Sequence, residues 1–141
     1  MEKIVLKGRK VCGGVAEGEA LVTKEAIGFL GGVNPNTGVV VEKKHELEGQ
    51  KITGRVLVFP HGKGSTSGPY VIHATARRGN GPVAMINVKA EPIIAVGAVM
   101  AGIPLMDNLE RNPIEVISTG DWVRVDADNG IIEITKGKPK D

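Results

Sequence analysis

Apolar and polar residues alternate near both ends of the chain. In the first part, residues 3–7 and 19–23 have the spacing of strands, and glycines interrupt the chain around them. In the last part, residues 122–126 and 131–135 alternate, and the Asp-Asn-Gly sequence at 128–130 favours a tight turn between them. The pattern therefore predicts β structure at both ends, closed by a C-terminal hairpin.

The middle of the chain changes its period more than once. Residues 55–59 are largely apolar and predict a buried strand, and residues 70–78 follow at helical spacing after Ser67, a residue suited to cap a helix. Residues 82–88 then predict a second buried strand, and residues 91–101 a helix that is apolar on nearly all sides. This succession predicts an α/β unit with parallel strands, inside a β-rich domain with two main helices.

Length and composition narrow the class of protein. The chain has 141 residues, of which 41% are apolar and 24% charged, as in an ordinary globular protein, so one domain over residues 1–141 is expected. Its 20 glycines, about twice the usual share, follow no three-residue period, which excludes collagen. Many of them fall in two loops, 28–38 and 62–68. In the first loop, Phe29 is either a packing anchor or the wall of a site.

Charge and hydropathy exclude several partners. Eighteen basic and 16 acidic residues give a formal charge of +2, and four aromatic side chains offer few platforms for stacking bases. The longest strongly apolar stretch, residues 93–101, is too short to span a bilayer, and no signal peptide is visible at the N-terminus. We therefore expect neither a nucleic-acid nor a membrane partner, and a cytoplasmic location.

The single cysteine, Cys12, limits metal and redox chemistry. It excludes an internal disulfide, and a thiolate-rich zinc site or an iron–sulfur cluster needs more cysteines than the chain has. The three histidines, His45, His61 and His73, have no ligand-like spacing with one another or with Cys12. No metal or cofactor is therefore expected on this chain, and any metal would be held mostly by another chain.

Residues 62–68 (GKGSTSG) are the strongest candidate for a site. They leave a strand and enter a helix, where backbone N–H groups and the positive end of the helix dipole favour an anion, and their glycines permit close approach to a ligand. A mobile surface loop would have the same composition. The Walker pattern is not met, because Gly64 follows Lys63, and the dinucleotide pattern would need a glycine at Ser67.

A serine in this loop is also a candidate base or nucleophile. N–H groups at the helix end, a nearby cation and the exclusion of water all favour a serine alkoxide. Alternatively, His61 or His73 accepts the proton, although a histidine at either position is more often structural. A Gly-x-Ser-x-Gly elbow is absent, because Thr66 stands at the centre of residues 64–68.

The remaining chemically reactive side chains show no pairing in the sequence. Cys12 is expected to be a small buried residue, and Trp122 a core residue of its strand. Four acids are candidates for catalysis, and no spacing joins them: Glu17, Glu19, Glu91 and Asp107.

Three separated motifs carry a resemblance to a known family. They are residues 31–38 (GGVNPNTG), 55–68 (RVLVFPHGKGSTSG) and 119–126 (TGDWVRVD). In this order they resemble the small subunit of the aconitase X family, and the similarity extends over essentially the whole chain. The resemblance implies a swivelling β/β/α domain, made as its own polypeptide, as the fold of residues 1–141.

The resemblance also implies an activity shared between two chains. A larger aconitase-like partner would carry a 4Fe-4S cluster and most substrate contacts, and the iron would act on the leaving hydroxyl. The reaction implied is the dehydration of (R)-5-phosphomevalonate to trans-anhydromevalonate 5-phosphate, in a modified mevalonate route to isoprenoids. Related enzymes act on other hydroxy acids, so another substrate of that class is an alternative.

Ser65 takes the catalytic role that the resemblance implies. Aconitase-like enzymes place a proton-accepting serine in a Gly-x-Gly-Ser loop, which here is residues 62–65. Gly64, Thr66 and Ser67 are then expected to contact the substrate. Aconitases follow the serine with Ser-Arg, and the arginine holds a substrate carboxylate. Here Thr66 and Ser67 stand instead, so the grip on the substrate must differ.

Two other function classes share some of these features. Swivelling phosphohistidine carriers have a glycine loop, Thr-Ser and then the phosphorylated histidine, but Gly68 occupies that place and His73 lies too far along the helix. A regulatory or binding module without catalysis is the third possibility. The absence of any cluster-bearing partner would favour it.

Overall fold

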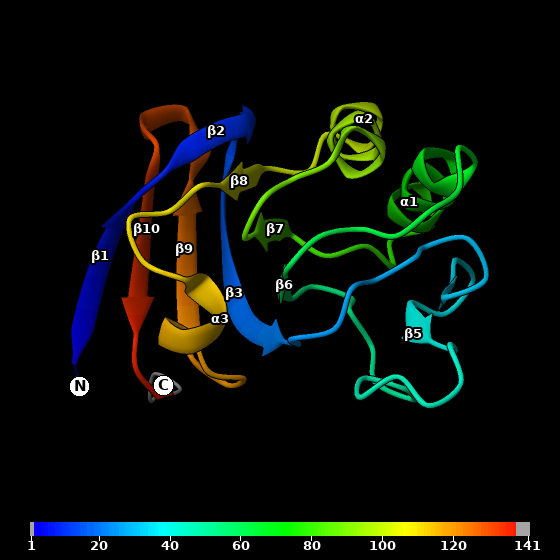
Figure 1. Ribbon diagram of the computed structural model, residues 1–141, viewed down its shortest axis with the longest axis horizontal. Coiled ribbons are helices and arrows are strands. Elements are labelled where there is room, and N and C mark those ends of the chain that lie inside the picture. The colour runs from blue at the N-terminus through cyan, green and yellow to red at the C-terminus, as the bar shows by residue number, and fades with distance from the viewer. Residues whose placement is uncertain (1, 138–141) are drawn as a thin grey trace.

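The computed structural model describes residues 2–137 of the chain. Eight strands form one sheet in the order β1-β10-β9-β3-β6-β7-β8-β2, and β4 pairs with β5 separately (Figure 1). The strands are β1 (Lys3–Lys7), β2 (Arg9–Cys12), β3 (Val15–Val22), β4 (Val33–Asn34), β5 (Val39–Val40), β6 (Val56–Phe59), β7 (Ala84–Asn87), β8 (Leu105–Asp107), β9 (Trp122–Asp126) and β10 (Ile131–Thr135). The predicted β-rich domain is confirmed, including the C-terminal hairpin of β9 and β10.

Two ten-residue helices, α1 (Gly68–Arg77) and α2 (Pro92–Ala101), pack against each other beside the sheet (Figure 1). Strands β6, β7 and β8, which these helices connect, run parallel, and β3 pairs with β6 in the same direction. The predicted α/β unit is confirmed. The pattern misses β8 and the four-residue helix α3 (Pro113–Val116), which are too short to show a period. No helix within residues 2–137 is long and apolar enough to cross a membrane.

Strand β6 lies between two hydrophobic cores. Leu57 and Phe59 enter the core that α1 and α2 cover, and Val56 and Val58 enter the core that β1, β9, β10 and α3 cover. Side chains alternate between the two faces of a strand, so a strand buried on both faces needs apolar residues at every position. The molecule therefore has three layers: the helices, the parallel strands, and the hairpin with β1.

Gly8 divides the N-terminal strand region into β1 and β2, the first and last strands of the sheet order. β1 pairs with β10, whereas β2 pairs with β8. The Gly8 N–H donates to the Gly130 carbonyl at 3.0 Å, and a side chain at position 8 would collide with Leu109 and lie 3.0 Å from the Asp107 carbonyl. This close approach favours glycine, and one continuous segment joins the two ends of the sheet there.

Two local predictions differ from the structure. β3 begins at Val15, earlier than the predicted residues 19–23. Trp122 is half-buried on the outer side of β9, where its Nε1–H donates to Glu17 Oε1 at 2.7 Å. The prediction of a core tryptophan is wrong, because the alternation of β9 gives the inward positions to Val123 and Val125.

Candidate active site

The loop of residues 62–68 leaves the carboxyl end of β6 and leads into α1. In α/β sheets, ligands bind at this edge, beyond the carboxyl ends of the parallel strands. Gly64 has a φ of +52°, a conformation that favours glycine, and Ser65 beside it is exposed. The predicted site therefore lies where a ligand can reach it.

Ser65 is held by the turn that begins α1. Its Oγ accepts the N–H of Ser67 at 3.2 Å, and its carbonyl accepts the N–H of Gly68 at 2.9 Å. Ser67 occupies the predicted N-cap position, but its side chain makes no capping hydrogen bond. One N–H group thus donates to Ser65 Oγ, whereas the sequence predicts that several converge there. The difference arises because Pro69 has no N–H and the N–H of Gly68 is used to close the turn.

The two glycine-rich loops lie against each other. Ile27 and Gly62 form a parallel bridge, and the Lys63 N–H donates to the Ile27 carbonyl at 3.1 Å. A side chain at Gly28 would approach the Lys63 carbonyl within 3.0 Å, so glycine permits this contact. Lys63 Nζ also pairs with Glu42 Oε2 at 2.7 Å. Residues 28–38 and their neighbours therefore support the loop that carries Ser65, and Glu42 offsets the charge of Lys63.

Phe29 is a packing anchor. Its side chain is buried, and its ring meets Phe59 edge-on, with ring centroids 6.3 Å apart and an interplanar angle of 63°. Of the two roles that the sequence leaves open, the structure shows this one, since Phe29 fixes its loop to the core beneath the helices.

None of the histidines bonds to Ser65 within residues 2–137. His45 is buried and bonds to backbone groups through both ring nitrogens. His61 is exposed, with Nδ1 2.7 Å from the carbonyl of the next residue, and His73 lies in the second turn of α1. These positions favour structural roles over a Ser-His pair.

The four candidate acids have structural contacts in separate parts of the fold. They are Glu17 with Trp122, Glu19 with Arg55, Glu91 with the first N–H groups of α2, and Asp107 with Arg9. Burial opposes the ionisation of Asp107, but hydrogen bonds from Arg9 and the Ala90 N–H outweigh it, so the pKa of Asp107 lies below its ordinary value. These acids do not join Ser65 in a site within the described range.

The described part of the chain does not fit an iron–sulfur cluster. Within residues 2–137, no three His, Cys, Asp or Glu side chains gather as a metal site requires. Cys12 is half-buried, rather than buried as predicted, and its burial raises the pKa of the thiol. Such clusters are held by several thiolates, which Cys12 alone cannot supply.

Sequence reasoning misses the exposed ring of Tyr70. This residue lies in the first turn of α1, after the Ser65 loop, and 67% of it is exposed. Ile72 and Thr75 face the interior of the protein. The helical period could have indicated the exposure, because residues two positions apart, such as Tyr70 and Ile72, lie on opposite sides of a helix.

Comparisons with known proteins give consistent results. A family model described as the aconitase X swivel domain matches residues 5–134. The phosphomevalonate dehydratase small subunit of Methanocella arvoryzae is 58% identical over 130 residues, which are 92% of this chain and 98% of that protein. Its namesake from Methanosarcina acetivorans is 53% identical over 138 residues, 98% of this chain and 96% of that protein.

Solved structures share the fold. The crystal structure of Thermococcus kodakaraensis aconitase X in its holo-form matches with a TM-score of 0.89 and 47% identity, over 94% of this chain and 99% of that one. A solution NMR structure of a UPF0107 protein matches with a TM-score of 0.87 and 49% identity, over 94% of this chain and all of that one. The swivelling fold expected from the three motifs is confirmed, and this chain belongs to the aconitase X swivel-domain family.

Proposed function

We propose that this chain is the small subunit of a dehydratase that converts (R)-5-phosphomevalonate to trans-anhydromevalonate 5-phosphate. The observation that carries this function is the sequence identity of 58% and 53% to two proteins named phosphomevalonate dehydratase small subunit. Each alignment covers nearly the full length of this chain and of the relative. Their name as small subunits also supports a larger partner. The enzyme is thus a hydro-lyase made of more than one chain, and this chain alone is expected to be inactive.

Ser65 is proposed as the proton acceptor. Its exposed Oγ lies at the carboxyl edge of the parallel strands and accepts the Ser67 N–H at 3.2 Å. That N–H stabilises negative charge on the oxygen, which a serine needs to act as a base. Ser65 Oγ then takes the proton from the carbon next to the one that loses its hydroxyl.

Gly64, Thr66 and Ser67 are proposed to contact the substrate. All three are exposed around Ser65. The Ser67 hydroxyl is not used as a helix cap, so it can donate to a substrate oxygen instead. Where aconitases have Ser-Arg, this chain has two hydroxyl side chains, which bind the substrate through neutral hydrogen bonds. The negative charges of the substrate are then bound by other groups.

The 4Fe-4S cluster is proposed to lie on the large subunit. Two observations support this: residues 2–137 contain no group of three potential metal ligands, and Cys12 is the single cysteine of the sequence. What this chain contributes is the base and the nearby hydroxyls. Closure of the swivelling domain over the large subunit would exclude water from them. A cytoplasmic location stays a prediction.

Replacing Ser65 by Ala tests the proposal in the reconstituted enzyme. A positioned general base contributes about 10²- to 10⁴-fold to a rate, so turnover of phosphomevalonate should fall by about that factor. Ser118→Ala is the matched control, because it removes an exposed loop hydroxyl next to α3, away from the Ser65 loop. Near-normal turnover with Ser65→Ala would remove Ser65 from the mechanism, whereas absence of dehydration by the wild-type pair would contradict the function itself.

A further inference from the structure

Helix α2 is apolar on the side that faces solvent as well as on the side that faces the core. Its ten residues include no charged or polar side chain. Ile94, Gly97 and Ala98 are buried. On the outer side, Val96 is 51% exposed and Val99 is 64% exposed. A helix that is apolar all round is normally covered on all sides, so the outer side of α2 indicates a surface that another molecule covers.

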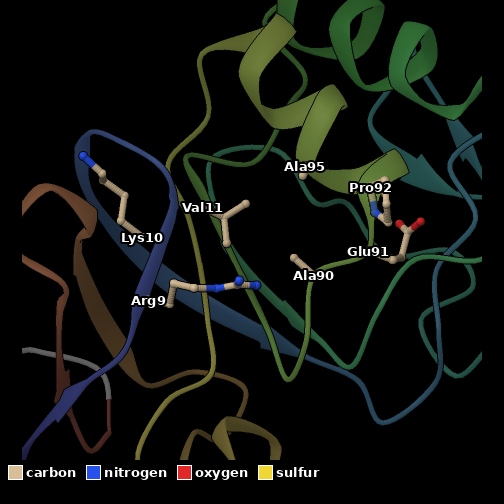
Figure 2. Close-up of a pocket in the computed structure, with 7 residues that line it drawn as sticks. All are labelled: Arg9, Lys10, Val11, Ala90, Glu91, Pro92 and Ala95. Carbon is tan, nitrogen blue, oxygen red and sulfur yellow. The ribbon is translucent and has the colours of Figure 1, made fainter.

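Three hollows run along this side of the helix and share residues. One, of about 370 Å³, lies between β2 and the start of α2 (Figure 2). It shares Ala95 with an apolar hollow of about 260 Å³ beside Val99, and it shares residues 90–92 with a hollow of about 350 Å³ that His61 also lines. We call this surface the α2 face. It consists of Arg9, Val11, Ala95, Val96, Val99 and Met100.

Arg9 supplies a fixed positive charge on the α2 face. Its Nε and Nη2 donate to the two carboxylate oxygens of Asp107 at 2.7 and 2.6 Å. Asp107 is fully buried and also accepts the Ala90 N–H, so it holds the guanidinium in place. In Figure 2 the guanidinium points toward Ala90, whereas Lys10 points away. Nη1 of Arg9 has no hydrogen-bond partner among residues 2–137, which leaves it for a carboxylate of another molecule.

The α2 face adjoins the loop that carries Ser65. A side chain at Gly68 would lie 3.1 Å from Ile93 Cγ2, and one at Gly62 would collide with Ile94 and lie 2.6 Å from Glu91 Oε1. The loop therefore rests on the first turn of α2. The hollow that His61 lines joins the hollow beside Arg9 through residues 90–92. A molecule on the α2 face can therefore extend to the loop of Ser65, where the proposed function needs a second chain.

We propose that the large subunit docks on the α2 face. Apolar side chains of the large subunit would cover Val96 and Val99, and a carboxylate of the large subunit would pair with Arg9. This inference rests on the proposed function. A second copy of this chain suits the face less well. If two copies met through the same face, the carboxylate for Arg9 would have to come from that face. Glu91, the carboxylate that lines the hollows, already accepts the N–H groups of Ile93 and Ile94 at 3.1 and 2.9 Å.

The test measures the affinity of this chain for the large subunit from the same source, by calorimetry. Val99→Glu and, independently, Val96→Lys place a charge on the α2 face and should each weaken binding by about tenfold or more, because a buried charge without a partner is costly in an interface. Both side chains are exposed in the isolated chain, so the melting temperature should stay unchanged. Val5→Glu is the matched control. Val5 is 53% exposed on β1, and its variant should bind as the wild type does.

The outcomes separate this inference from the proposed function. Wild-type affinity of both α2 variants would overturn the inference while leaving the function intact. If the wild-type chain binds no large subunit at all, the proposed function fails first. Self-association of the wild-type chain in sedimentation, lost in Val99→Glu while binding to the large subunit persists, would overturn the inference in favour of a second copy.

Discussion

Asp107 shows how one side chain organises the edge of the sheet. The sequence marks it as an acid without a partner. In the structure it is buried at the end of β8 and joins β2 to the segment before α2, through Arg9 and the Ala90 N–H. Asp121 also joins separate segments, because it accepts Lys136 Nζ at 2.6 Å and the Ser118 N–H at 2.8 Å. Burial opposes the ionisation of Asp121, but its hydrogen bonds outweigh burial and lower the pKa of Asp121.

Because the folded pKa of Asp107 is lowered, the unfolded chain binds more protons in acid. The stability that Asp107 contributes is therefore present above about pH 4, near the ordinary aspartate pKa, and is lost as pH falls through the folded value. Asp107→Asn should lower the free energy of unfolding by about 1–3 kcal/mol at pH 7, and the difference from the wild type should shrink below pH 4. Urea unfolding at pH 7, 4 and 2.5 measures this.

The control for this experiment is Glu115→Gln, which removes an exposed acid of α3 outside the network. Its stability should follow the wild type at each pH. A difference between Asp107→Asn and the wild type that stays constant down to pH 2.5 would contradict the assignment of this acid sensitivity to Asp107.

The two main helices depend on a small residue where they pack together. Gly97 of α2 faces Ile72 of α1, and an added Cβ would lie 3.2 Å from Ile72 Cβ and collide with Ile72 Cδ1. Glycine disfavours a helix by about 1 kcal/mol relative to alanine. Its presence in the middle of α2 is explained by this close approach, which the helical period alone could not show.

Gly97→Ala should destabilise the protein by about 1–2 kcal/mol, because overpacking costs about 1–3 kcal/mol and the better helix propensity offsets part of that. Ile72→Val removes the Cδ1 methyl that an alanine would meet. The double variant should therefore be more stable than the sum of the two single effects predicts, as measured by thermal unfolding. Strict additivity of the two effects would show that the helices do not collide at this point.

At the scale of the whole molecule, the chain presents an exposed serine, Ser65, beside the first turn of an apolar helix that is uncovered on its outer side. Ser65 lies on the loop that follows β6, and the α2 face extends from β2 along helix α2, whose first turn contacts that loop. The described residues offer no set of metal ligands. This combination suits half of an active site that a second chain completes.

Iron–sulfur reconstitution tests this division between chains. Anaerobic addition of iron and sulfide to this chain alone should give no cluster absorbance after desalting, because Cys12 cannot hold a cluster alone. The same treatment of the large subunit should give it, with and without this chain. Cys12→Ser controls for iron bound nonspecifically through the thiol. Cluster absorbance on this chain that persists in Cys12→Ser would contradict the proposed division.

Local patterns were enough to predict β6, both main helices, the C-terminal hairpin and the loop of Ser65, because each depends on residues that are neighbours in the chain. The tertiary structure alone decided what lies far apart in sequence. Arg9 and Asp107 pair across 98 positions. The uniformly apolar α2 likewise gave no sign of its exposed side. Which distant groups meet, and whether a helix without a polar side stays uncovered, depends on how the layers pack, and the period of a single segment does not show it.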